Sequence, residues 1–422
     1  MSVATRAFEI HRGTVGRLKV AVVPIAGLRS VSALLALEAG QWSEPEGRPG
    51  IARLTAQSLL RGTATRDAAS WASALDDLGA VARMDVGAHV AIMSGQCLAA
   101  DVPAYLRLVA DAVLRPALVP DQIELVRAET VAALEEESRN TRGVADRVWR
   151  ELAFPPLHPF RSRPLGDEQV VRAAQVAELR AFHAREILAR GGVLVLAGGT
   201  DAAAGLAAAE DAFGAWPTGA AATERHVPQA TIATLQRRAE VVPDKTQSDV
   251  IIGWLGLPRA DPRFVAARVA NMVFAADTFA SRAGKVVRDK LGLAYYLFST
   301  IAATKGQGAW LVRMGVNPKN VDRAIDTTLA ELRVVLAGDF PQDDLELAHD
   351  KLTGELRVAL ESPFGIAQMV LEQELFDLGL DHYEHYAEQI RAVTKEQVIE
   401  IARTFLPADR YALAIAGPPL DR

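Results

Sequence analysis

The chain carries one ordered set of sequence features twice, with an offset of roughly 220 residues. Ser32–Leu37 and Asp249–Gly253 are apolar, strand-like runs, and each leads into a polar loop with proline and then into a helical pattern. Late in each half, a helical stretch precedes a second apolar run, at Leu194–Gly198 and at Leu413–Gly417. This offset is too long for a solenoid, so the sequence predicts two domains of one ancestral fold.

Strand-like runs alternate with long helical periods, which defines the fold class. Residues 120–139 and 321–337 are two such periods. The pattern predicts an α/β sandwich of helices packed on a sheet in each half. A stretch of small residues with proline, Trp216–Ala222, precedes Pro228 and indicates a linker. The predicted organisation is an N-terminal domain over 1–218, a linker over 219–236 and a C-terminal domain over 237–422.

Composition bounds the class of protein. With 422 residues, 50% of them hydrophobic and 23% charged, the chain is globular and long enough for two cores. A net charge of −6 without a basic tail argues against non-specific binding of nucleic acid. Cys97 is the only cysteine, which excludes an internal disulfide framework and a cysteine metal cluster; a small core thiol is the expected role.

No apolar run is long enough to span a bilayer. The first residues, Met1–Arg6, lack the pattern of a signal peptide. We therefore expect a cytoplasmic protein, with the periplasm as the alternative if a signal peptide has been removed from the sequence.

A series of short motifs lies between Ser30 and Ala80. In order, they are Ala39-Gly40-Gln41, Glu44-Pro45, Gly50-Ile51-Ala52, Gly62-Thr63 and Leu78-Gly79-Ala80. The series resembles the first βα unit of the pitrilysin, insulinase and mitochondrial processing peptidase family, the inverted zincins. In that family the same unit carries the zinc-binding motif H-x-x-E-H on a helix.

Every catalytic side chain of that helix is missing here. The two histidine positions hold Arg53 and Gln57, and the glutamate position holds Ala56. The family's third ligand is a glutamate roughly 76 residues past the second histidine, and counting from Gln57 leads to Ala133. A small shift of register would offer Glu135 or one of its acidic neighbours, but a single carboxylate does not hold zinc. We predict no metal and no cofactor in this chain.

A second resemblance covers the segment from Ser281 to Tyr295. Gly292-Leu293-Ala294 with Arg288 and Tyr295 matches the family's second-domain signature, R-x-x-x-G-L-A-Y. A phenol hydroxyl can stabilise the oxyanion of amide hydrolysis, and a guanidinium can grip a peptide carbonyl. Without the resemblance, Arg288 would be a solvated helix residue and Tyr295 the start of a strand. The run Phe274–Arg282 lacks the family's glycines, so presequence recognition of the mitochondrial kind is not supported.

The resemblance implies two mainly antiparallel sheets that face one another as a clamshell. It also implies a bacterial heterodimer in which one subunit carries H-x-x-E-H with zinc and the other carries only the arginine and tyrosine. Relatives bind peptides as an added strand at a sheet edge. Ser30–Leu37 and Asp249–Gly253 are the segments to examine for such an edge, although both could equally be paired central strands.

The sequence therefore predicts a non-catalytic subunit of a zinc metallopeptidase that binds peptide and, when unpaired, is able to form a homodimer. The alternative is a scaffold of the same fold with no part in proteolysis. A hydrolase with unrelated catalytic residues has the least support. His382 and His385 flank Glu384 but match no zincin spacing, and we interpret them as surface residues of a helix. His158, before Pro159, is interpreted as structural.

Overall fold

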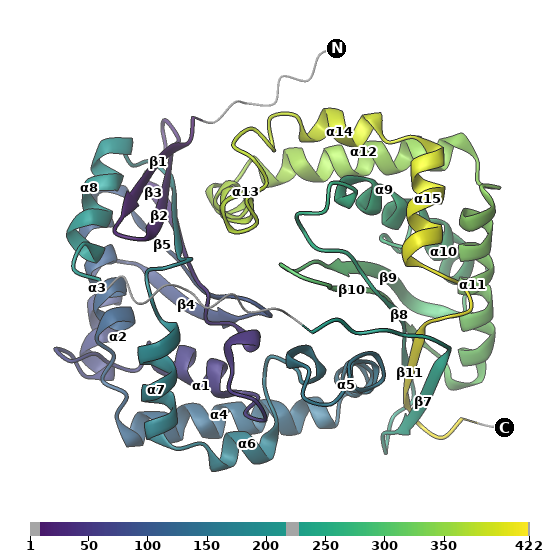
Figure 1. Cartoon of the computed structure of the whole chain (residues 1–422), viewed down its shortest axis with the longest axis horizontal. Coiled ribbons are helices and arrows are strands. Elements are labelled where there is room, and N and C mark those ends of the chain that lie inside the picture. The colour runs from purple at the N-terminus through teal and green to yellow at the C-terminus, as the bar shows by residue number, and fades with distance from the viewer. Residues whose placement is uncertain (1–8, 217–227, 421–422) are drawn as a thin grey trace. The chain divides into compact units, whose positions relative to one another are not determined.

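The structure is a computed structural model of the chain, and it describes residues 9–216 and 228–420 (Figure 1). The described residues form two compact units. Unit 1 holds the described parts of Met1–Ala133, Arg163–His226 and Arg357–Glu384, and unit 2 holds those of Leu134–Ser162, Val227–Leu356 and His385–Arg422. Residues 217–227, which include half of the predicted linker, lie outside the described residues. The boundaries predicted for the two domains and the linker stay predictions.

Unit 1 contains a six-stranded sheet in the order β1-β2-β6-β3-β5-β4. Only β2 and β6 are parallel; the other neighbours are antiparallel. The strands are β1 (His11–Val15), β2 (Leu18–Pro24), β3 (Ser30–Leu37), β4 (Val81–Val86), β5 (Ala91–Leu98) and β6 (Val193–Gly198).

Unit 2 contains a five-stranded sheet in the order β7-β11-β8-β10-β9, again with one parallel pair, β7 and β11. The strands are β7 (Gln236–Val241), β8 (Ser248–Leu255), β9 (Ala294–Ala302), β10 (Ala309–Val316) and β11 (Ala412–Gly417). This order and its directions repeat those of β2-β6-β3-β5-β4. The prediction of two related, mainly antiparallel sheets flanked by helices is confirmed. In both sheets the segments considered as edges, β3 and β8, are central strands.

Helices cover both sheets. In unit 1 they are α1 (Ile51–Ser58), α2 (Ala68–Asp77), α3 (Val102–Leu114), α6 (Glu168–Ala173), α7 (Val176–Glu186), α8 (Ala202–Phe213) and α13 (Pro363–Leu375). In unit 2 they are α5 (Thr141–Ala153), α9 (Phe264–Phe274), α10 (Arg282–Gly284), α11 (Val321–Ala337), α14 (Tyr386–Ala392) and α15 (Lys395–Phe405). Two long helices, α4 (Pro120–Ser138) and α12 (Gln342–Ala359), run from one unit into the other. No helix of the described residues is long and apolar enough to cross a membrane.

Each sheet is completed by a helix from the other half of the sequence. In Figure 1, α5, blue like the N-terminal half, lies on β11, β8 and β7, and the yellow-green α13 lies on β6 and β3. In unit 1, α13 packs on alternate strand residues such as Leu34 and Val195, whereas Gly205 of α8 contacts Val22 and Leu196, which point to the opposite face. Neither half therefore buries its own sheet completely.

The packing of α5 on unit 2 generates a test of this arrangement. An ideal Cβ at Gly253 would lie 2.2 Å from Nε1 of Trp149 and 2.5 Å from Leu311. Because a packed core has no room for it, we expect Gly253→Ala to lower the free energy of unfolding by about 1–3 kcal/mol. Urea denaturation of the purified chain measures this change.

Gly354→Ala is the matched control. Gly354 lies inside α12 with nothing within 4 Å of an added Cβ, so we expect a gain of about 0.5–1 kcal/mol from helix propensity. Equal effects of the two substitutions would contradict the packing described for α5.

Candidate functional site

Helix α1, which carries the predicted positions Arg53, Ala56 and Gln57, is capped at its N-terminus by the side chain of Glu44. One carboxylate oxygen of Glu44 accepts hydrogen bonds from the backbone N–H groups of Gly50 (2.7 Å) and Ala52 (3.0 Å). Gly50 has a φ of 106°, which favours glycine, and an added Cβ there would lie 2.8 Å from Val171. Burial raises the pKa of Glu44 to about 8, although the two N–H groups act in the opposite direction. Glu44 and Gly50, two of the motif residues near these positions, thus stabilise the start of α1.

The predicted ligand positions on α1 now serve packing and strand contacts. Ala56 is buried. The amide Nε2 of Gln57 donates to the carbonyl of Met84 in the edge strand β4, and Arg53 is partly buried. Arg61 bonds to Glu129 of α4 at 2.7 Å, and Ala133 lies one helical turn further along α4. Nowhere in residues 9–216 and 228–420 do three His, Cys, Asp or Glu side chains form a group able to hold a metal ion.

In unit 2, Arg288 and Tyr295 are in direct contact. Arg288 lies on a π-helix, η4 (Lys285–Lys290), and its Nε donates to the backbone carbonyl of Tyr295 at 3.1 Å. π-helical turns are rare and occur often at functional sites. The spacing of seven residues seen in the sequence thus becomes one contact in space.

Tyr295 lies at a β-bulge. Along β9 and β10, Gly315 faces Tyr296 and Val316 faces Ala294, so Tyr295 has no counterpart on β10. Its side chain is 79% exposed. Bulges re-aim side chains next to active sites. The phenol of Tyr295 is therefore presented to solvent by the backbone and not packed against the sheet.

Phe279 extends the pair in a way that the sequence analysis missed. The residue is 61% exposed, and the guanidinium of Arg288 lies 4.3 Å from the centroid of its ring. Asp277 holds the loop by accepting the N–H groups of Phe279 (2.8 Å) and Ala280 (2.7 Å). Against the effect of burial, Lys351 and these N–H groups keep the pKa of Asp277 below its ordinary value. The only sequence signal was an aromatic residue shortly before Arg288.

A second network, also missed, lies beside the bulge. Tyr296 donates from its hydroxyl to Asp249 of β8, and Thr141 at the start of α5 donates to the other carboxylate oxygen. Arg142 lies over the Tyr296 ring, 4.6 Å from its centroid. Burial and Asp249 raise the pKa of Tyr296. Gly315 leaves room for this ring, since a Cβ there would lie 2.5 Å from it.

The remaining candidates have ordinary roles. His158 accepts the N–H of Phe160 and bonds to the carbonyl of Pro228, which fits the structural interpretation. His382 and His385 lie in the turn before α14, so the expectation that they are on a helix was wrong. Nδ1 of His385 lies 3.5 Å from a carboxylate oxygen of Glu388. Burial raises the pKa of Cys97 to about 12, so its thiol is not a nucleophile at neutral pH.

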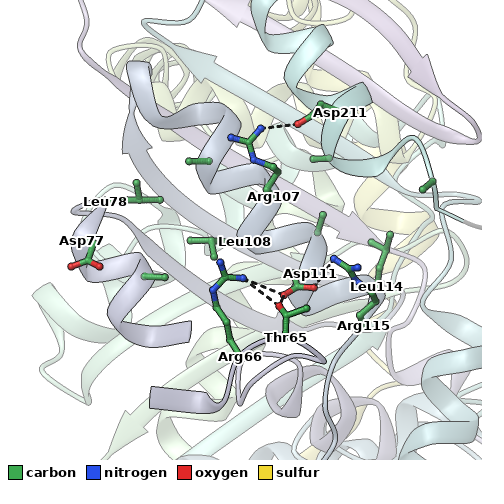
Figure 2. A pocket seen from close by; sticks show the side chains of 15 residues that line it. Thr65, Arg66, Asp77, Leu78, Arg107, Leu108, Asp111, Leu114, Arg115 and Asp211 are labelled. Atoms are coloured by element: carbon green, nitrogen blue, oxygen red, sulfur yellow. Dashed lines mark hydrogen bonds and ion pairs between the residues drawn. The ribbon is translucent and has the colours of Figure 1, made fainter. Parts of the chain in front are cut away.

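Unit 1 also contains a cavity of about 810 Å³ between α2, α3 and α8 (Figure 2). Asp111 is 4% exposed and accepts hydrogen bonds from Thr63 (2.6 Å) and Thr65 (2.7 Å). The arginines that line the cavity are paired with aspartates: Arg66 and Arg115 with Asp111, and Arg107 with Asp211. None of the predicted site residues lines this cavity. Its charges are compensated internally, and they indicate no ligand.

Two mixed sheets of one topology carry a partly exposed Arg288 beside the exposed Tyr295 in unit 2. The matches to known proteins are described as zinc proteases or as inactive members of that class. Residues 173–352 match the family model described as the peptidase M16 inactive domain. An uncharacterised zinc protease of Mycobacterium tuberculosis is 25% identical over 96% of this chain and 92% of its own length.

Two further relatives are described as inactive. A probable inactive metalloprotease of Bacillus subtilis, YmfF, is 25% identical over 27% of this chain and 26% of its own length. A crystal structure of a peptidase M16 inactive domain from Pseudomonas fluorescens superposes with a TM-score of 0.91, covering 98% of this chain and 99% of that one at 23% identity. The chain is thus similar to the peptidase M16 inactive domain over residues 173–352 and shares its fold with the Pseudomonas fluorescens structure.

Rebuilding the ligand set tests the assignment of the vacated positions. The triple variant Arg53→His, Gln57→His, Ala133→Glu places two histidines four residues apart on one helix face and a carboxylate on α4. We expect the triple variant to bind one zinc ion per chain, measured by metal analysis after dialysis.

The control keeps both histidines but leaves Ala133 unchanged, and we expect it to bind zinc weakly because one ligand is missing. Failure of a folded triple variant, checked by circular dichroism, to bind zinc would show that these positions are not the counterparts of the family's ligands.

The pKa of Glu44 gives a second expectation. A carboxyl with a native pKa of about 8 and an ordinary value of 4.5 keeps its proton in the native state while the unfolded chain releases it. Stability should therefore fall as pH rises between these two values. Glu44→Gln retains an acceptor oxygen for the two N–H groups but cannot ionise. We expect the unfolding free energy of the wild type, relative to this variant, to decrease from pH 5 to pH 8. A constant difference would contradict the raised pKa.

Proposed function

We propose that the chain is the non-catalytic subunit of a heterodimeric zinc metallopeptidase and that it supplies Arg288 and Tyr295 to the active site of a partner with an intact H-x-x-E-H helix. The observation that carries the proposal is the contact between these two residues, presented together by a π-helix and a β-bulge. The described residues of unit 1 contain no group of zinc ligands beside which Arg288 and Tyr295 would act. The similarity to the peptidase M16 inactive domain supports a partner of the same fold.

In this proposal, the zinc ion of the partner supplies the Lewis acid and the activated water. Tyr295 donates a hydrogen bond from its exposed hydroxyl to the oxyanion of the tetrahedral intermediate. The Nε of Arg288 donates to the backbone of Tyr295, its Nη1 to Asp289 at 3.3 Å, and its guanidinium lies on Phe279. The remaining Nη2 would donate to a peptide carbonyl. The tyrosine would act in the chemical step and the arginine mainly in binding.

Peptide binding is placed at a sheet edge by this proposal. Strands β3 and β8 are central, so the edges are β1 and β4 in unit 1 and β7 and β9 in unit 2. Strand β9 begins next to Tyr295, which makes its first residues the stretch along which a peptide strand would lie. A clamshell closing around the peptide is part of the same proposal.

The test uses the chain purified together with its H-x-x-E-H partner. Tyr295→Phe removes only the hydroxyl, and we expect it to lower kcat/KM for a quenched fluorescent peptide by about 100-fold or more, the usual effect of losing one oxyanion donor. Arg288→Ala should raise KM more than it lowers kcat. Size-exclusion chromatography should show an unchanged heterodimer.

Lys290→Ala is the control, because Lys290 is an exposed cation of the same π-helix. We expect it to leave turnover unchanged. Unchanged turnover in both the Tyr295 and the Arg288 variants would favour the scaffold function. Zinc-dependent hydrolysis by the chain alone would overturn the proposal.

A further inference from the structure

The side chain of Arg142 is fixed in position but keeps unused donors. Its Nε donates to the hydroxyl of Tyr296 at 3.2 Å, and its guanidinium lies on the ring of the same residue. The side chain is 58% exposed. Among the described residues, no hydrogen bond or ion pair involves its two terminal nitrogens. The outer edge of this guanidinium is a planar pair of donors facing solvent.

Arg142 is not needed to satisfy the carboxylate beneath it. Asp249 is 6% exposed, and its two oxygens accept hydrogen bonds from Tyr296 and Thr141. The Nε of Arg142 is 3.8 Å from the nearer oxygen, which is too far for a hydrogen bond. The buried network therefore holds the Tyr296 ring, and the ring holds Arg142. The arginine is the outermost member of the network, not its support.

The two arginines of the strands on this face, Arg313 and Arg238, are committed to other groups, Arg238 to Glu151 of α5. Arg313 donates to Thr300 and to Asp146, both at 2.9 Å. Asp146 also accepts a hydrogen bond from Nε of Arg150. Unlike these arginines, Arg142 keeps both terminal nitrogens without a partner among the described residues, and it lies on the residue that follows Tyr295.

We propose that Arg142 is a carboxylate-binding site and that it selects peptides with a carboxylate close to the bond held by Arg288 and Tyr295. The fork of a guanidinium matches a carboxylate with two parallel hydrogen bonds. The carboxylate could be the peptide's C-terminus or an Asp or Glu side chain, which have the same recognition chemistry. This inference rests on the proposed function, since it takes a peptide bound beside Tyr295 as given.

Binding to the full chain tests the inference without any hydrolysis. Three fluorescein-labelled peptides of one neutral sequence are compared by anisotropy: one with a free C-terminus, one amidated, and one amidated with a single Gln replaced by Glu. We expect at least one carboxylate peptide to bind about tenfold more tightly than the neutral one, as expected for a charge-assisted hydrogen bond. The peptide that gains affinity identifies the source of the carboxylate.

Variants of the chain decide whether Arg142 is responsible. Arg142→Gln should abolish the difference between the peptides. Arg139→Gln, an exposed arginine three residues away with no partner among the described residues, should retain it. Tyr296→Phe keeps the ring but removes the hydroxyl, and we expect an intermediate loss.

Equal binding of the three peptides, no measurable binding of any, or an equal loss in the Arg139 variant would overturn the inference. Failure of the proposed function has a different signature: the Arg142-dependent preference would persist while Tyr295→Phe left turnover of the heterodimer unchanged.

Discussion

The docking of α5 on the second sheet is the contact on which the rest of unit 2 depends. Trp149 fits against Gly253, where no side chain could be added, and Asp146 pairs with Arg313 of β10. Arg147 and Glu151 pair with Glu240 and Arg238 of β7. The indole N–H of Trp149 has no hydrogen-bond partner among the described residues, so packing and not hydrogen bonding holds this side chain. The sheet that carries Tyr295 is thus covered by a helix from the first half of the sequence.

This dependence reaches the candidate site directly. The first turn of α5 supplies Thr141, which donates to Asp249, and Asp249 in turn accepts the hydroxyl of Tyr296. Tyr296 is the residue after the bulge, so the same helix that completes the core also steadies the strand at the point where Tyr295 turns outward. On the other side of the bulge, Asp277 and Lys351 hold the Phe279 loop on which Arg288 rests. The pair is held from two directions by elements distant in sequence.

Much of this could be predicted from the sequence, because local patterns carried it. The repeat predicted two related sheets, and the segment from Ser281 to Tyr295 contained the two residues, Arg288 and Tyr295, that lie in contact. The exchange of α5 and α13 could not be predicted, since apolar periodicity shows that a helix face is buried but not on which sheet. The contact between Arg142 and Tyr296 joins residues 154 positions apart and depends on that exchange. The sequences of β3 and β8 are ordinary apolar runs, which do not show whether a strand is central or at an edge. The order of the strands in the folded sheet decides this.

The structure also separates two kinds of motif residue. Glu44 and Gly50 start α1, and Thr63 bonds to the buried Asp111, so these residues are required by the fold whether or not a metal is bound. Their resemblance to the family is therefore evidence of fold. Tyr295 is different: its side chain is 79% exposed and an alanine there would leave no cavity. The core does not need this side chain, and a bulge holds it outward beside Arg288. This difference in structural role, more than the match to a motif, is why we propose a function for unit 2.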